Sequence, residues 1–172
     1  MIRRLGSLTG KRIYFGYDRY LVPELDAYRE ILGEVGQVIE AVDHNRLHYL
    51  TSAELVCRSV QADAEAFGVL CCGTGMGMSI AANKFAGIYA ARCTSADDSE
   101  MCRTINNANV VCIASKQGLA MNATILHTFA STAYTGRKLE ELEYITSFEA
   151  SPFLPPVNAA LPAGPRSFRR TA

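Results

Sequence analysis

Short apolar runs alternate along the chain with longer segments whose apolar residues recur every three or four positions. The apolar runs predict strands at residues 12–16, 38–42, 69–72, 88–93 and 110–114. The segments with helical spacing predict helices over 21–32, 51 to about 67, 96–104, 119–135 and about 140–148. Strands that are apolar throughout and alternate with helices are typical of a parallel sheet covered on both faces. The pattern therefore predicts an α/β fold, a three-layer doubly wound sandwich around a five-stranded parallel sheet of Rossmann-like layout.

Two kinds of signal mark helix ends in this pattern. Gly33 and Gly36 are expected to end the first helix, because glycine is unfavourable inside helices and common just after them. Thr51 and Glu54 have the spacing of a capping box, which predicts that the second helix begins there.

The chain divides by composition into one domain and a short C-terminal segment. Residues 1–150 have the length of a single domain with a full core. Residues 151–172 hold five of the six prolines, so this segment is expected to be either disordered or an extended arm. Phe153, Leu154 and Phe168 favour an arm that packs on a neighbour.

Charge and cysteine content exclude several classes of protein. Seventeen basic and seventeen acidic side chains cancel, so no net field attracts nucleic acid or an anionic membrane. The apolar runs are too short to span a bilayer, and no apolar run follows the basic N-terminus as in a secretory signal. The six cysteines show neither CxxC nor zinc spacing, which favours reduced thiols in a cytoplasmic protein.

The most informative segment is residues 69–93, where a buried strand runs into a glycine-rich turn. Cys72 ends this strand, and Gly73, Gly75 and Gly77 follow before a helix begins. Open α/β sheets bind ligands at the carboxyl ends of their strands, and a helix N-terminus stabilises negative charge there. Cysteines in such apolar patterns are usually core residues. The position of Cys72 nevertheless makes it a candidate catalytic thiolate.

The sequence CGTGMGMSIAANKFAGI closely resembles the active-site segment of the ribose-5-phosphate isomerase B and galactose-6-phosphate isomerase family. The resemblance extends from Arg12 to about Tyr144. It implies the same doubly wound fold and an aldose–ketose isomerase of a small sugar phosphate, with no metal or organic cofactor. It also implies active sites assembled from two chains, so a homodimer is the smallest expected assembly and a tetramer is a further possibility.

Isomerisation of this kind needs a base next to the substrate carbonyl and donors for the enediolate oxygens. Cys72 can be the base, and Thr74 can hydrogen-bond its sulfur; the family residues that match these two have those roles. The amides around Gly73 to Ser79 are expected to cradle substrate oxygens. Some relatives place a Glu base where this chain has Met76, so the cysteine version of the chemistry applies here.

The resemblance also implies a set of substrate-binding residues. They are Asp18, Arg19, Tyr49, Gly73, Gly75, Gly77, Ser79, Asn106, Lys116 and Arg137. Lys116 and Arg137 match two of the three family arginines that bind phosphate, whereas the third position falls near Glu141, which would repel it. The alternative interpretation of Asp18 is a helix N-cap, that of Asn106 an ordinary turn residue, and that of Arg137 part of a solvated charged face.

Two family histidines are absent. Ile105 stands where ribose-5-phosphate isomerases of the family have the histidine that opens the furanose ring, and Arg19 replaces another. A cysteine base without a ring opener fits a substrate that is already open-chain. Four-carbon sugar phosphates cannot close a stable ring through a phosphorylated oxygen, so erythrulose 4-phosphate and erythrose 4-phosphate become candidate substrates.

Two other functions are compatible with parts of the sequence. The galactose-6-phosphate isomerase branch has a partner subunit without the catalytic cysteine, so an accessory subunit of a heteromeric isomerase is an alternative. Retention of Cys72 and Thr74 argues against it. A nucleotide site at the glycine turn is weaker, because the spacing and downstream acid of the dinucleotide fingerprint are missing. The substrate's carbon count and its phosphate stay open.

Overall fold

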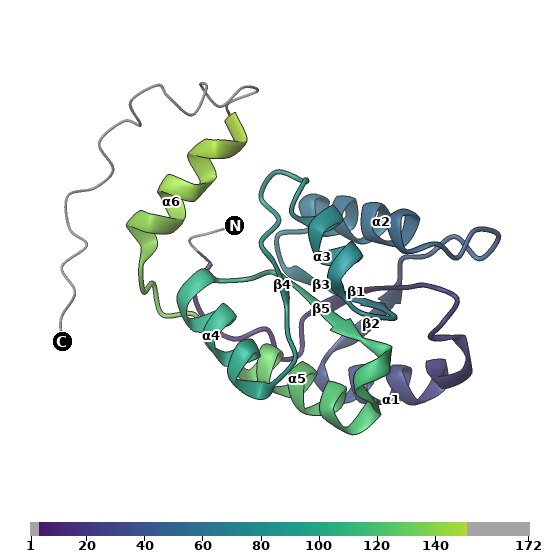
Figure 1. The fold of residues 1–172 in the computed structure, drawn as a ribbon. Coiled ribbons are helices and arrows are strands. Elements are labelled where there is room, and N and C mark those ends of the chain that lie inside the picture. The colour runs from purple at the N-terminus through teal and green to yellow at the C-terminus, as the bar shows by residue number, and fades with distance from the viewer. Residues whose placement is uncertain (1–3, 151–172) are drawn as a thin grey trace.

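The computed structural model describes residues 4–150, so the predicted arm over 151–172 lies outside the described residues. Five parallel strands form one sheet in the order β2-β1-β3-β5-β4 (Figure 1). The strands are β1 (Arg12–Tyr17), β2 (Gln37–Glu40), β3 (Ala66–Cys72), β4 (Ala90–Arg92) and β5 (Val110–Ala114). The predicted five-stranded parallel sheet is confirmed.

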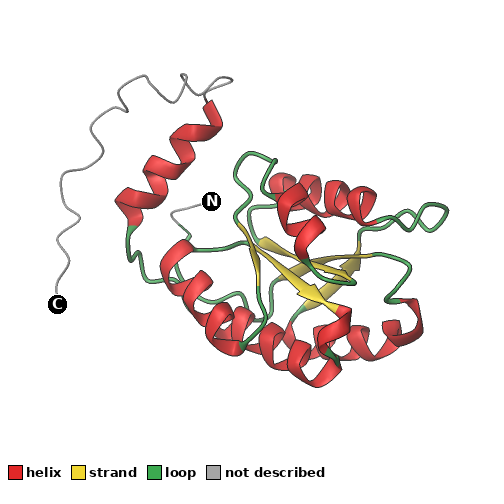
Figure 2. Cartoon of the chain, in the orientation of Figure 1, coloured by secondary structure: helices red, strands yellow, loops and turns green. Residues whose placement is uncertain are grey.

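Helices cover both faces of the sheet, as Figure 2 shows in red around the yellow strands. The α-helices are α1 (Leu25–Val35), α2 (Tyr49–Ala62), α3 (Met76–Ala82), α4 (Ala96–Asn106), α5 (Leu119–Ser131) and α6 (Leu139–Ser147). Short 3-10 helices lie at η1 (Val22–Glu24), η2 (Ser115–Gln117) and η3 (Phe148–Ala150). The three-layer, doubly wound architecture predicted from the sequence is therefore confirmed.

Two separate apolar cores fill the space between the layers. One joins α1, α4 and α5 to one face of the sheet, and the other joins α2 and α3 to the opposite face. Side chains alternate between the two cores along β3, because successive residues of a strand point to opposite faces. Val69 and Cys71 therefore belong to the first core, and Leu70 and Cys72 to the second.

Helix α2 lies close to the sheet because two strand residues have no side chain. A Cβ atom on Gly16 would lie 2.7 Å from Val56 Cγ2, and one on Gly68 would lie 2.7 Å from Val56 Cγ1. Val56 of α2 thus occupies the space above both glycines. This contact fixes the height of α2 above β1 and β3 and, with it, the position of Tyr49 at the start of the helix.

The predicted start of the second helix was wrong by two residues. Helix α2 begins at Tyr49, and His48 caps it by accepting a hydrogen bond from the Leu50 amide at Nδ1, 3.3 Å away. The predicted capping box does not form, because Thr51 already lies inside the helix; Glu54 pairs with Arg58 at 2.9 Å on the exposed face.

Other element boundaries also differ from the sequence prediction. Gly33 lies inside α1, and only Gly36 follows its last residue. The second helix ends at Ala62 rather than near residue 67, because residues 66 and 67 already pair with β1 as part of β3. Helix α5 ends at Ser131, four residues before the predicted end.

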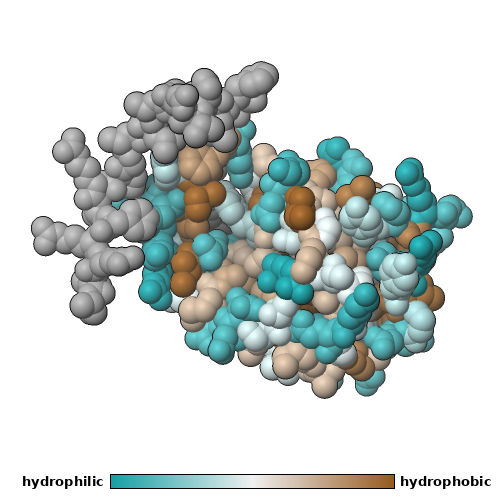
Figure 3. Space-filling view, in the orientation of Figure 1, coloured by the Kyte–Doolittle hydropathy of each residue, from teal (hydrophilic) through white to brown (hydrophobic). Residues whose placement is uncertain are grey.

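Helix α6 packs on the far end of the domain from the glycine turn. Leu142 of α6 and Tyr134 form a small apolar cluster with Tyr89, whose hydroxyl lies 2.7 Å from Thr146 Oγ1. Figure 3 shows apolar surface over α6 and over α3, separated by hydrophilic residues. No helix in the described part of the chain is long and apolar enough to cross a membrane.

Replacing Gly68 with Ala is expected to lower the free energy of unfolding by about 1–3 kcal/mol, because the new methyl group would overlap Val56. Val56→Ala removes the overlap, so the double variant should lose less than the sum of the single losses. Urea denaturation measures the free energy of unfolding of all three variants.

A glycine with free space provides the control for this packing effect. Gly33 lies inside α1 with nothing within 4 Å of its Cβ position, so Gly33→Ala should stabilise the protein by about 0.5–1 kcal/mol. Strictly additive losses for Gly68→Ala and Val56→Ala would show that the contact does not set the height of α2.

Candidate active site

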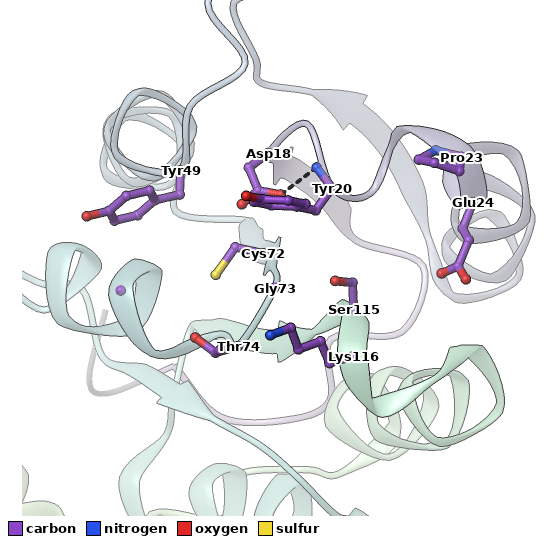
Figure 4. Close-up of a pocket in the computed structure, with 11 residues that line it drawn as sticks. Asp18, Tyr20, Pro23, Glu24, Tyr49, Cys72, Gly73, Thr74, Ser115 and Lys116 are labelled. Carbon is purple, nitrogen blue, oxygen red and sulfur yellow. Dashed lines mark hydrogen bonds between the residues drawn. The ribbon is translucent and has the colours of Figure 1, made fainter.

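A pocket lies where the chain leaves β1 and β3 toward opposite faces of the sheet. Helix α1 follows β1 on one face, and α3 follows β3 on the other, so the carboxyl ends of these neighbouring strands flank a crevice. A pocket of about 640 Å³ occupies it (Figure 4). Its lining residues are Asp18, Tyr20, Pro23, Glu24, Tyr49, Cys72, Gly73, Thr74, Gly77, Ser115 and Lys116.

Cys72 forms the floor of this pocket at the end of β3. Its side chain belongs to the core beneath α2 and α3, yet 6% of the residue stays exposed. Figure 4 shows the sulfur directed into the space between Tyr49 and Thr74. The backbone amide of Gly75 donates a hydrogen bond to Sγ at 3.2 Å. A thiolate is stabilised by such a donor more than a thiol is, because the acceptor carries a full charge.

Gly75 can present its amide to the sulfur only because it has no side chain. Its φ of 71° lies in the left-handed region, and it caps the N-terminus of α3. A Cβ atom there would also lie 3.1 Å from the carbonyl oxygen of Ile113. The donor to the sulfur is thus Gly75 rather than Thr74 as predicted. The Thr74 hydroxyl instead accepts the Met76 amide at 3.4 Å and lines the pocket.

Asp18 brings a buried carboxyl group to the opposite wall. Its amide donates to the carbonyl of Cys71 at 3.2 Å, which ties the residue after β1 to the end of β3. Burial raises the pKa of Asp18 above its ordinary value, whereas the amides of Tyr20 and Gly73 and the charge of Arg19 act in the opposite direction. The carboxyl group is therefore oriented by local donors and can accept a hydrogen bond from a substrate hydroxyl.

Tyr49 closes the side of the pocket next to α3. A Cβ atom on Gly77 would lie 2.8 Å from Cε2 of the Tyr49 ring. The ring therefore rests against the backbone of the first turn of α3, in space that any other residue would fill. Gly77 is needed here for close packing.

One cation faces these groups across the pocket. Lys116 lies in η2, directly after β5, and its amide donates to the carbonyl of Gly73 at 3.4 Å. Its side chain extends toward Thr74 in Figure 4. Among the described residues that line the pocket it is the sole cation, whereas Asp18 and Glu24 are both acidic. An anionic group of a ligand is thus expected to lie on the Lys116 side.

Comparison with known proteins gives the family. Residues 15–145 match the model of the family described as Ribose/Galactose Isomerase. The chain belongs to this ribose/galactose isomerase family.

Relatives and solved structures agree with this assignment. A 4-deoxy-4-sulfo-D-erythrose isomerase of Clostridium sp. (strain MSTE9) is 38% identical over 95 residues, covering 54% of this chain and 58% of that protein. A D-erythrulose-4-phosphate isomerase of Pectobacterium atrosepticum is 45% identical over 49 residues, covering 28% of this chain and 32% of that protein. The aligned region is thus less than two thirds of each relative.

The structural similarity covers almost the whole of a family enzyme. The type B ribose 5-phosphate isomerase of Leishmania infantum superimposes with a TM-score of 0.75 at 30% identity. The superposition covers 82% of this chain and 97% of that chain. The resemblance seen in the glycine-rich segment therefore extends to the complete isomerase fold.

Seven of the residues expected from the isomerase family lie together in the pocket. They are Asp18, Tyr49, Cys72, Gly73, Thr74, Gly77 and Lys116. Gly75 lies directly behind them. Arg19 is next to Asp18, but its guanidinium group lies over the exposed Tyr20 ring at 5.2 Å from the centroid. Ser79 lies farther along α3, where its amide donates to the Gly75 carbonyl, so this amide is not available to a ligand.

Two other family positions lie at the opposite end of the strands from the pocket. Asn106 is the last residue of α4, just before β5 begins, whereas the pocket lies where β5 ends. Arg137 follows Tyr134, which pairs with Gly6 ahead of β1. The five residues of β5 separate the amino and carboxyl ends of the strand by roughly 16 Å. Neither side chain belongs to the pocket of its own chain, and their substrate contacts stay a prediction.

Sequence reasoning missed four pocket residues. Tyr20, Pro23 and Glu24 follow β1, and Ser115 follows β5. All four lie in the segments that leave the carboxyl ends of these two strands. That position alone was a usable signal, since ligands bind at those ends in open α/β sheets. The family pattern includes Asp18 and Lys116 but not these four residues.

Three of the other cysteines lack the features that distinguish Cys72. Burial raises the pKa of Cys57 to about 12 and raises the pKa values of Cys71 and Cys112 as well. These thiols stay neutral at physiological pH and act as core residues. Residues 4–150 contain no group of three or more His, Cys, Asp or Glu side chains that could hold a metal ion.

Replacing Gly75 with Ala should slow the reaction of Cys72 with iodoacetamide at neutral pH by at least about threefold, because moving the amide weakens its support of the thiolate. Gly87→Ala is the matched control. Gly87 has a similar φ of 72° but nothing within 4 Å of its Cβ position. Mass spectrometry of the labelled peptide measures the rate. Equal slowing in both variants would mean that backbone strain, not the amide, is responsible.

Proposed function

We propose that this protein is an aldose–ketose isomerase of a small sugar phosphate, acting through a cis-enediolate with Cys72 as the base. The observation that carries the proposal is the Cys72 sulfur. It ends a buried strand, faces the pocket and accepts a hydrogen bond from the Gly75 amide. Membership of the ribose/galactose isomerase family supports the same reaction class.

The proposed reaction moves one proton between neighbouring carbons. The Cys72 thiolate removes a proton from the hydroxyl-bearing carbon beside the carbonyl, and the electron pair forms the carbon–carbon double bond of the enediolate. The carbonyl π electrons move to its oxygen. The thiol then returns the proton to the former carbonyl carbon, while the hydroxyl proton passes to the other oxygen. The hydroxyl of Thr74 and the ammonium of Lys116 are placed to stabilise the charge that develops on these oxygens.

The proposed substrate is a four-carbon, open-chain sugar phosphate. None of the described residues that line it is a histidine, and Ile105 has no proton to exchange. A furanose would meet no histidine among these lining residues to open its ring. Two of the related enzymes are named for four-carbon sugars, one sulfonated and one phosphorylated. We therefore favour erythrulose 4-phosphate, with its anionic end on the Lys116 side and its hydroxyl groups toward Asp18.

The complete site is proposed to need two chains. Asn106 and Arg137 lie at the amino ends of the strands, opposite the pocket, and both are exposed. A second copy of the chain can bring its own Asn106 and Arg137 to the pocket of the first. Arg137 would then add the second positive charge that a phosphate or sulfonate needs, because Lys116 alone faces two carboxyl groups. A homodimer, or a tetramer built from it, is the proposed assembly.

The substrate proposal predicts that kcat/KM for erythrulose 4-phosphate exceeds that for ribose 5-phosphate by at least about tenfold, since a site without a ring opener meets little open-chain pentose. Coupled assays or NMR on purified protein measure both. Cys72→Ser should lower the preferred activity by at least about a hundredfold, because a serine hydroxyl is a poor base.

A control variant and two further outcomes distinguish a wrong substrate from a wrong reaction class. Cys57→Ser removes a buried thiol outside the pocket and should leave kcat/KM unchanged. A clear preference for ribose 5-phosphate would contradict the tetrose assignment but retain the isomerase. No turnover of any tetrose, pentose or hexose phosphate would contradict the isomerase itself and favour an accessory subunit.

Shared active sites predict complementation between two inactive variants. Cys72→Ala and Asn106→Leu each disable every site of their own homodimer. A mixed dimer retains one intact site, so equal, fully exchanged amounts should recover about one quarter of wild-type activity. Asn106 is exposed at the end of α4, so its replacement is not expected to disturb folding. Activity no higher than the mean of the two separate variants would place the whole site within one chain.

A further inference from the structure

Arg92 reaches the glycine turn from the end of the edge strand. It is the last residue of β4, the shortest strand of the sheet, and is partly buried. Its Nε donates a hydrogen bond to the backbone carbonyl of Thr74 at 2.8 Å. Its Cγ packs 3.5 Å from the position that a Cβ atom on Gly75 would take. The side chain thus contacts the turn without lining the pocket.

The peptide that Arg92 binds is the one that contacts the catalytic sulfur. The carbonyl of Thr74 and the amide of Gly75 belong to one planar unit. Arg92 binds the oxygen of this unit at 2.8 Å, and Cys72 Sγ accepts its N–H at 3.2 Å. Fixing the carbonyl therefore fixes the direction of the amide. Arg92, the peptide and Cys72 form a continuous chain of two hydrogen bonds.

The charge of Arg92 strengthens the same two hydrogen bonds that its geometry orients. A donor on the carbonyl polarises the peptide and strengthens the hydrogen bond made by its N–H. The guanidinium charge adds to the effect, because no described carboxylate forms an ion pair with Arg92. Of the two acids in the first turn of α4, Asp98 accepts hydrogen bonds from the amide and hydroxyl of Thr94 instead.

We propose that Arg92 is a positioning residue that holds the Thr74–Gly75 peptide so that its amide supports the Cys72 thiolate. Its contribution to catalysis rests on the proposed isomerase function. Its effect on the reactivity of Cys72 does not, because alkylation needs no sugar. The planar guanidinium suits this role, since its Nε–H points in a fixed direction whereas a lysine ammonium is a mobile point charge.

Arg92→Met tests the proposal, because it retains much of the apolar stem and removes the donor and the charge. We expect the rate of Cys72 alkylation by iodoacetamide at neutral pH to fall about tenfold, with kcat also about tenfold lower and KM within about twofold of wild type. Arg92→Lys should recover part of both losses. Arg58→Met is the matched control, because Arg58 pairs with Glu54 on the surface of α2, and it should change neither rate.

The direction of the alkylation change separates support of the thiolate from general loosening. A loosened turn exposes Cys72 and accelerates its alkylation, whereas loss of the amide slows it. Unchanged or faster alkylation in Arg92→Met would overturn the proposal, even if kcat fell. If Arg92→Met does not fold, Arg92→Lys provides the same comparison, and alkylation at the wild-type rate would overturn it.

Failure of the two proposals can be told apart. A wild-type protein that turns over no sugar phosphate contradicts the isomerase function, while slower Cys72 alkylation in Arg92→Met still supports the positioning role. An active wild type with equal alkylation in both proteins contradicts Arg92 alone.

Discussion

The divergence of the chain after β1 and β3 is the constraint on which the site depends. Because α1 and α3 leave these adjacent strands on opposite faces, their carboxyl ends stay uncovered and flank the pocket. Val56 sets how closely α2 approaches the sheet, and α2 in turn places Tyr49 against Gly77. The pocket is therefore a consequence of topology and of three close backbone approaches.

Within this frame, one peptide unit connects the structure of the turn to its chemistry. The Gly75 amide contacts Cys72 Sγ, and the same unit accepts a hydrogen bond from Arg92. Burial raises the pKa values of three other cysteines, Cys57, Cys71 and Cys112. Cys72, at the end of a strand and hydrogen-bonded to the Gly75 amide, is thus distinguished from these three core cysteines.

Much of the fold and part of the site could be predicted from the sequence. Apolar periodicity and the alternation of strands with helices were sufficient for the parallel sheet, and Cys72 followed from its place before the glycine turn. A local signal failed at Thr51, because α2 already begins at Tyr49 with His48 as its cap. Arg92 was read only as part of a strand, because its contact with Thr74 joins residues 18 positions apart. The distance of Asn106 and Arg137 from the pocket likewise could not be predicted without the order and direction of the strands.

The central claim is that Cys72 moves a proton between adjacent carbons of a sugar phosphate. Proton NMR in deuterated water tests it directly, with erythrulose 4-phosphate as substrate and the wild type compared with Cys72→Ala. The account predicts deuterium incorporation at the carbon beside the carbonyl in the wild type and none above background in the variant. Equal incorporation with both proteins would show that another group is the base, and no incorporation with either would contradict this substrate for the proposed isomerase.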